Sequence, residues 1–189
     1  MGDPLGIGPE ILIKALNHTQ IHSTCKPLVL GDKQIMEKAL QFSTQSFKIR
    51  NLQHPDQGIY EYGTLNIMSL SDLALSALDG KRPCMETGKA MRAYILKGVE
   101  LAQKKQISAL VTCPITKTGL KLAGSQFHGH TELIAHHTGT DRFAMMLAGE
   151  KLKVVLVTIH IPISHVSKAI NGDNILKVIH LTQDALKTR

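Results

Sequence analysis

The sequence predicts an α/β fold, a three-layer α/β/α arrangement with a mostly parallel sheet, and three observations favour it. Short runs rich in β-branched residues alternate along the chain with stretches of helical spacing, which is typical of a parallel sheet covered by helices. The 189 residues are enough for one sizeable core. Hydrophobic residues make up 43% of the chain, as in a globular protein. We therefore expect a single α/β region over residues 1–189.

Five segments have the composition of buried strands: Pro27–Gly31, Phe47–Arg50, Leu65–Ser69, Ser108–Thr112 and Val154–Thr158. A further run, Phe143–Leu147, faces Lys153–Val157 across a short segment that contains a glycine, which predicts a β-hairpin. Such a hairpin would add one antiparallel strand to an otherwise parallel sheet.

Three segments have the spacing of amphipathic helices. The clearest is Thr87–Lys105, in which apolar side chains recur on one face and Thr87 is a candidate N-cap. Asp32–Leu40 and Asn174–Leu186 have the same periodicity, with Asp32 and Asp173 as candidate N-caps.

Neither a membrane span nor a disulfide framework is expected. The longest apolar run, Val154–Ile163, is shorter than the roughly 20 residues that a bilayer requires. The opening residues lack the basic and apolar regions of a secretion signal, so we expect a cytoplasmic protein. Three widely spaced cysteines argue against disulfides and against a zinc site with four thiolates.

The charge of the chain points to an anionic partner. The formal net charge is +7 and the pI is about 9.4. Aromatic residues make up only 4%, tryptophan is absent and the cationic residues are scattered, so we expect no nucleic-acid partner. A phosphorylated small molecule is the expected partner instead.

Two glycine-containing segments are candidates for ligand binding. Gly2–Glu10 is a glycine-rich loop that opens a helix, and such loops bring backbone N–H groups close to an anion; a simple turn is the alternative. In Gly129–Glu132, Gly129 or Thr131 is a candidate cap for a helix that begins at Glu132. His130 and Thr131 would then donate to phosphate or carboxylate oxygens, and an ordinary cap with an exposed histidine is the alternative.

Two further residues lie where strands are expected to end. Lys117 follows such an end, where it would attract a phosphate, or burial could lower its pKa enough for proton transfer. His160 ends a β-branched run, and a neutral imidazole there can ligate a divalent metal. A surface lysine and a structural histidine are the alternatives.

Taken together, these segments resemble the 4-hydroxythreonine-4-phosphate dehydrogenase family of pyridoxal phosphate biosynthesis. Met1–Glu10 matches the opening loop of that family, Pro114–Lys117 its central loop, Gly129–Glu132 its substrate motif and Thr158–Pro162 its first metal-ligand segment. The four motifs occur in the family's order over nearly the whole chain.

The resemblance implies a fold similar to isocitrate and isopropylmalate dehydrogenases, and it implies the reaction. The secondary alcohol of 4-phosphohydroxy-L-threonine would be oxidised with NAD or NADP, and the resulting β-keto acid would lose its carboxylate to give 3-amino-2-oxopropyl phosphate. His130 and Thr131 would contact the phosphorylated substrate, and His160 would be one of three histidine ligands to zinc, magnesium or cobalt. Lys117 is our own candidate for phosphate binding or proton transfer.

The family also differs from this chain at both ends. Its members carry a strand before the opening loop and continue with segments of the types NPHAG and DHGT, which supply the other metal histidines. We therefore expect residues 1–189 to be an interior section of a larger two-domain subunit, incomplete in its C-terminal part, from a family that forms homodimers.

Three other functions remain open. A related dehydrogenase of a phosphorylated four-carbon sugar acid would use the same loops. A phosphate acyltransferase of similar architecture would need no metal, so His160 would be dispensable. A non-catalytic remnant would bind a ligand or partner through the surviving loops.

Overall fold

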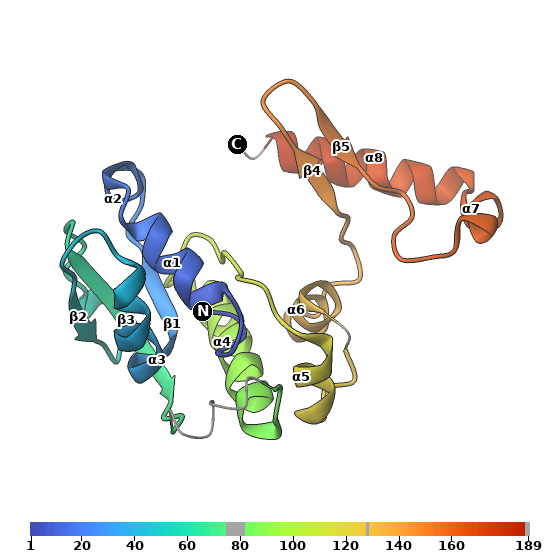
Figure 1. Ribbon diagram of the computed structural model, residues 1–189. Coiled ribbons are helices and arrows are strands. Elements are labelled where there is room, and N and C mark those ends of the chain that lie inside the picture. The colour runs from blue at the N-terminus through green and yellow to red at the C-terminus, as the bar shows by residue number, and fades with distance from the viewer. Residues whose placement is uncertain (75–81, 128, 188–189) are drawn as a thin grey trace. The chain divides into compact units, whose positions relative to one another are not determined.

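A parallel sheet near the start of the chain organises the first of two units into which the chain divides (Figure 1). The computed structural model describes residues 1–74, 82–127 and 129–187. The units are Met1–Thr138 and Gly139–Arg189. The expectation of a single α/β region within a larger two-domain subunit stays a prediction.

The sheet of the first unit has three strands, β1 (Leu28–Asp32), β2 (Lys48–Asn51) and β3 (Thr64–Ser71). Their order is β1-β3-β2 and both pairings are parallel. The first three predicted strands and the parallel arrangement are thereby confirmed. Four consecutive residues of β3, 65–68, are buried. Because neighbouring side chains of a strand point to opposite faces, both faces of the sheet are covered.

Six helices belong to this unit within its described residues: α1 (Gly8–Leu16), α2 (Thr19–Thr24), α3 (Lys33–Ala39), α4 (Met85–Gln103), α5 (Lys117–Leu122) and α6 (His130–Thr138). Short 3-10 segments occur at Leu40–Phe42 and Pro55–Gln57. Helices α3 and α4 contact β1 and β3, and α5 and α6 contact α4. Helix α4 therefore connects the sheet with the two helices that carry the candidate substrate residues.

The core of the first unit is formed by side chains from α1, β1, α3, β3 and α4. Ile13, Met36 and Ile67 have no exposed surface, and Leu65 and Leu101 are almost completely buried. Burial of such side chains stabilises a fold by about 1.5–3 kcal/mol each, so this cluster is the main source of stability for the surrounding loops.

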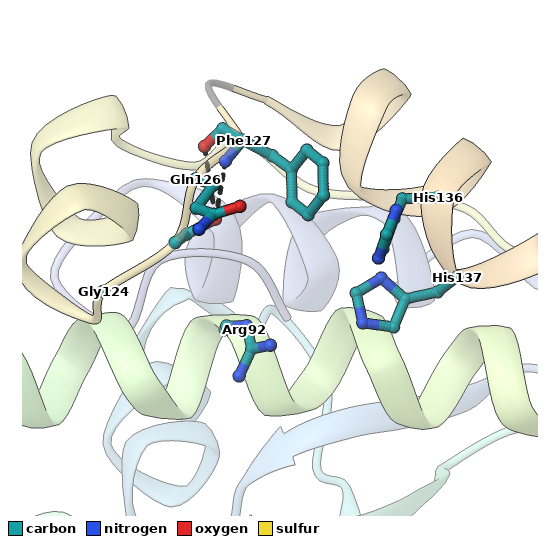
Figure 2. Close-up of a pocket in the computed structure, with 7 residues that line it drawn as sticks. Arg92, Gly124, Gln126, Phe127, His136 and His137 are labelled. Carbon is teal, nitrogen blue, oxygen red and sulfur yellow. Dashed lines mark hydrogen bonds between the residues drawn. The ribbon is translucent and has the colours of Figure 1, made fainter.

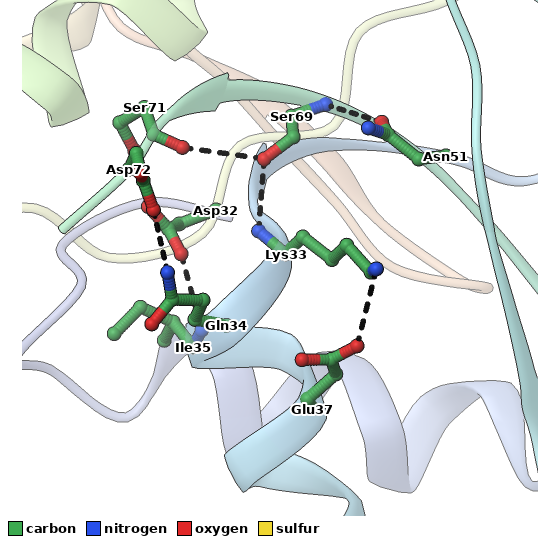
Figure 3. Close-up of polar contacts among 9 residues, drawn as sticks. All are labelled: Asp32, Lys33, Gln34, Ile35, Glu37, Asn51, Ser69, Ser71 and Asp72. Atoms are coloured by element: carbon green, nitrogen blue, oxygen red, sulfur yellow. Dashed lines mark hydrogen bonds and ion pairs between the residues drawn. The ribbon is translucent and has the colours of Figure 1, made fainter. Parts of the chain in front are cut away.

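Asp32 joins the carboxyl ends of β1 and β3, and part of its network is seen in Figure 3. Its carboxylate accepts from the N–H of Ile35 at 3.2 Å, which confirms it as the N-cap of α3. Its other oxygen accepts from the Ser71 hydroxyl at 2.7 Å and from the N–H of Leu73 at 2.9 Å. The fully buried carboxylate thus satisfies three donors from two elements.

Thr87 is not the N-cap that the sequence predicts for the long helix. Helix α4 begins at Met85 after Cys84, and the Thr87 hydroxyl accepts from the N–H of Cys84 at 3.1 Å. Thr87 therefore lies at the third helical position and closes a capping box from inside the first turn.

The second unit contains β4 (Met146–Ala148), β5 (Lys153–Val155), α7 (Ile163–Ala169) and α8 (Gly172–Lys187). The predicted hairpin is confirmed, because β4 and β5 pair antiparallel. It forms a two-stranded sheet of its own, so the expectation that it joins the parallel sheet is wrong. Helix α8 begins one residue before Asp173, and the Asn171 side chain accepts from the N–H of Asn174 at 2.8 Å. Asn171 therefore takes the capping role predicted for Asp173.

Two predicted strands differ from the structure. Ser108–Thr112 is not a strand, and the side chain of Val111 is 89% exposed. A β-branched run becomes a strand only where another strand pairs with it, and no described strand does so here. Val154–Thr158 contributes only its first two residues to β5, for the same reason. Within the described part of the chain, no helix is both long and apolar enough to cross a membrane.

Candidate functional site

The opening glycine-rich loop packs directly against the central loop. The N–H of Asp3 donates to the carbonyl oxygen of Pro114 at 3.0 Å. A Cβ atom added at Gly2, whose φ is +79°, would lie 2.8 Å from Cβ of Cys113. A Cβ atom added at Gly8 would overlap the carbonyl oxygen of Met1 in the opening loop. It would also lie 3.1 Å from Cβ of Cys113 in the central loop. Side chains at either position would separate the two loops, so the glycines allow this close approach.

Asp3 also fixes the shape of the opening loop from within. Its side chain is buried and accepts from the N–H of Leu5 at 2.9 Å, while its carbonyl oxygen accepts from Gly6 at 3.0 Å. The chain then enters α1, in which Pro9 lies in the first turn, where the missing N–H of proline costs nothing. The loop is thus a rigid, internally bonded structure.

The central loop ends at helix α5. The Thr116 hydroxyl accepts from the N–H of Gly119 at 3.2 Å and caps the helix, so that Lys117 is its first residue. The side chain of Lys117 is exposed. An exposed ammonium is suited to attracting a phosphate, and both roles of Lys117, phosphate binding and proton transfer, stay predictions.

His130 is the first residue of α6, two residues before the predicted helix start at Glu132. Both His130 and Thr131 consequently lie in the first helical turn, where the helix dipole favours anions. The Nε2 atom of His130 is buried and has no hydrogen-bond partner among the described residues. Burial lowers the pKa of His130 and thereby favours the neutral form of the imidazole.

The opening loop lies near His130 as well as against the central loop. The second, smaller cause of the lowered pKa of His130 is the positive charge of the Met1 amino group, which means that the opening loop lies close to this imidazole. Cys113 contacts the opening loop at Gly2 and Gly8, and burial raises the pKa of its thiol. The sequence offered no signal for Cys113 beyond its position before Pro114, because only the folded contact with Gly2 and Gly8 reveals its role.

His160 lies in the second unit, between β5 and α7, and is exposed. Its φ is +56°, a left-handed conformation that is uncommon for residues other than glycine and costs of order 1–3 kcal/mol. No group of three or more His, Cys, Asp or Glu residues that could hold a metal occurs in ranges 1–74, 82–127 and 129–187. The described residues therefore do not fit a complete metal site, and His160 stays a predicted ligand.

The fold and these loops define a parallel α/β protein in which a glycine-rich loop packs against a cysteine-bearing loop and lies near a helix-terminal histidine. Residues 23–189 match the family described as "Pyridoxal phosphate biosynthetic protein PdxA". The chain belongs to this family.

Curated relatives and solved structures agree with that assignment. The chain is 51% identical over its whole length to a 4-hydroxythreonine-4-phosphate dehydrogenase of Desulforapulum autotrophicum, of which it covers 56%. It is 37% identical over 85% of its length to a D-threonate 4-phosphate dehydrogenase of Cupriavidus necator, of which it covers 48%. A crystal structure of a 4-hydroxythreonine-4-phosphate dehydrogenase from Burkholderia phymatum superposes with a TM-score of 0.87 at 36% identity, covering 95% of this chain and 54% of that one. The chain thus spans about half the length of the relatives it matches.

Proposed function

We propose that this chain acts in the NAD- or NADP-dependent oxidation and decarboxylation of 4-phosphohydroxy-L-threonine to 3-amino-2-oxopropyl phosphate. Membership of the PdxA family and the 51% identity to a dehydrogenase of that name support the proposal. The observation that carries it is the buried, unpartnered Nε2 of His130 beside the opening loop. An unsatisfied buried polar atom costs about 1–3 kcal/mol, and a substrate oxygen that accepts from this nitrogen would remove that cost.

In this proposal the first turn of α6 binds the substrate phosphate. His130 donates from Nε2 as a neutral imidazole, Thr131 donates from its hydroxyl, and the helix dipole adds to both interactions. Lys117 draws the phosphorylated substrate towards the loops through its exposed positive charge. The rigid Asp3 turn holds the opening loop in position against Cys113.

The redox chemistry requires a nicotinamide cofactor as hydride acceptor. The alcohol carbon gives up a hydride and the hydroxyl gives up its proton. The bond to the carboxylate then breaks, carbon dioxide leaves and the carbon that carried it is protonated. His160 remains our candidate ligand for zinc, magnesium or cobalt, and its left-handed backbone supports a functional role.

The same proposal includes a fold similar to isocitrate and isopropylmalate dehydrogenases, a homodimer and a cytoplasmic location. The parallel sheet covered on both faces supports the first.

The test measures substrate binding and turnover separately, using this chain and its His130→Asn variant. Calorimetry with 4-phosphohydroxy-L-threonine is expected to give binding that the substitution weakens at least about tenfold, the loss expected for a hydrogen bond to a charged group. His165→Asn, which removes an exposed histidine of α7, should bind like the parent. Equal binding by all three chains would contradict the assignment of His130. Nicotinamide reduction, followed by absorbance with added divalent metal, tests the redox step.

Oxidation of D-threonate 4-phosphate is the second candidate function. The 37% identity to a D-threonate 4-phosphate dehydrogenase favours it. The two substrates share the phosphate, and D-threonate 4-phosphate carries a hydroxyl where 4-phosphohydroxy-L-threonine carries an amine. The ratio of kcat/KM for the two substrates decides between the candidates. A larger value for 4-phosphohydroxy-L-threonine is expected, and the reverse would make the sugar acid the substrate.

A further inference from the structure

A pocket of about 220 Å³ lies beside the contact of α4 with α6, and none of the candidate residues Lys117, His130, Thr131 and His160 lines it. Figure 2 shows its wall, in which a side chain of α4 faces the segment before α6 and the last turn of that helix. The side chains that bound it are those of Arg92, Ser125, Gln126, Phe127, His136 and His137.

The pocket has positive charge and no counterion. Arg92 forms no hydrogen bond or ion pair with any residue that the structure describes, and no carboxylate is among the lining side chains. The charges of α4 that are paired lie further along the helix, where Glu100 binds Lys97 and Lys104. A half-buried guanidinium that lacks an acidic partner retains its full capacity to bind an oxyanion, commonly with two parallel hydrogen bonds.

The two histidines of the pocket are held in fixed positions. Nδ1 of His137 donates to the carbonyl oxygen of Leu133 at 2.9 Å, so Nε2 of the neutral ring accepts from a P–OH group, and Nε2 of the protonated ring donates to an oxyanion. The ring of His136 packs against the rings of Phe127 and His137, with centroid separations of 4.9 Å and 5.1 Å. The pocket therefore presents a guanidinium and an imidazole from opposite elements, and an aromatic surface lies beside them.

The pocket is separate from the first turn of α6. His137 follows His130 by seven residues on the same helix, which corresponds to a rise of about 10 Å at 1.5 Å per residue. A single phosphate group cannot contact both positions, because its oxygens span only a fraction of that length.

We propose that Arg92, His136 and His137 form a second oxyanion site, which takes a phosphate group of a small molecule. A tetrahedral phosphate offers three oxygens, and it therefore uses donors that converge from α4 and α6 more fully than a carboxylate does. The neighbouring Phe127 and His136 rings give an attached organic group an aromatic surface.

The test places the sole tryptophan of the chain in the pocket by the substitution Phe127→Trp, since the natural sequence has none. The probe is inorganic phosphate, added to this variant. The variant also carries His130→Asn, so that phosphate bound at the first turn of α6 does not contribute to the fluorescence change. A saturable change in tryptophan emission is expected. Addition of Arg92→Gln should weaken the binding at least about tenfold.

The matched control is Lys89→Gln, which removes one positive charge from an exposed position of the same helix. Its affinity should stay within about twofold of the parent, whereas an equal loss in both variants would mean non-specific attraction and would overturn the proposal. Absence of a saturable signal would also overturn it, as would equal affinity for acetate. Circular dichroism establishes that each variant is folded, and His137→Asn gives an independent variant that should also weaken phosphate binding.

Discussion

The two units of this chain contain similar elements but differ in burial. Residues 1–138 enclose a core between helices and a sheet covered on both faces, whereas no described residue of 139–187 is buried. Helix α8 nevertheless has a clear apolar face, formed by Ile175, Leu176, Ile179 and Leu186, all at least 39% exposed. Amphipathic periodicity in a sequence therefore indicates which face of a helix is apolar, and it does not determine whether another element covers that face.

The largest expected effect comes from the core of the first unit. Leu65→Ala in β3 should lower the free energy of unfolding by about 2–5 kcal/mol, because it leaves a cavity in the packed sheet. Ile179→Ala in α8 should change it by no more than about 0.5 kcal/mol. Urea unfolding monitored by circular dichroism measures both, and comparable losses would show that α8 is buried in solution.

Two glycine substitutions, one in each unit, test the same difference in packing. Gly8→Ala should destabilise the first unit by about 1–3 kcal/mol and weaken substrate binding, because the methyl group meets Cys113 and the loop backbone. Gly172→Ala is the control, since a Cβ there meets no atom within 4 Å. Its free energy of unfolding should be unchanged or slightly higher. Thermal unfolding and substrate calorimetry distinguish the two, and a neutral Gly8→Ala would contradict the close loop contact.

A smaller effect is expected from the titration of His130. Its folded-state pKa lies below the usual 6.5, so the unfolded state binds more protons between these two values. Stability should therefore fall as the pH decreases from 6.5 to the folded-state pKa and should then level off. His130→Asn should remove this component when unfolding is measured as a function of pH. An unchanged pH profile in the variant would mean that His130 is not the group responsible.

The smallest effect on stability is expected on the apolar face of α8. Ile179→Lys should leave the free energy of unfolding nearly unchanged but should reduce self-association, because exposed apolar faces promote contacts between molecules. Light scattering at increasing protein concentration measures the association. A parent chain that stays monomeric throughout would show that this face does not drive association.

The sequence was sufficient to predict the elements whose signals are local. Strands β1, β2 and β3 and the Asp32 cap of α3 follow from short-range patterns, and all four are present. Ser108–Thr112 shows where such patterns fail, because its strand-like composition meets no pairing partner in the described structure. Pairing depends on residues far away in the sequence, which a local pattern does not contain.

The candidate site was predictable only in part, for the same reason. The motifs identified His130 and Thr131, but the unpartnered Nε2 of His130 follows from its surroundings in the fold. The pocket around Arg92 and His137 had no sequence signal at all, since its members lie on separate helices with no shared motif. Their proximity results from the packing of α6 against α4.

The contact of Gly2 and Gly8 with Cys113 has a consequence for how this sequence can vary over time. The room at position 113 is limited by backbone atoms on the opposing loop, so a bulkier side chain there requires the glycine loop to retreat. A side chain at Gly2 or Gly8 would meet the carbonyl oxygens of Pro114 and Met1 as well as Cβ of Cys113, so a smaller side chain at position 113 would not make room for it. Both glycines are therefore expected to be retained, and position 113 is expected to vary only among small side chains.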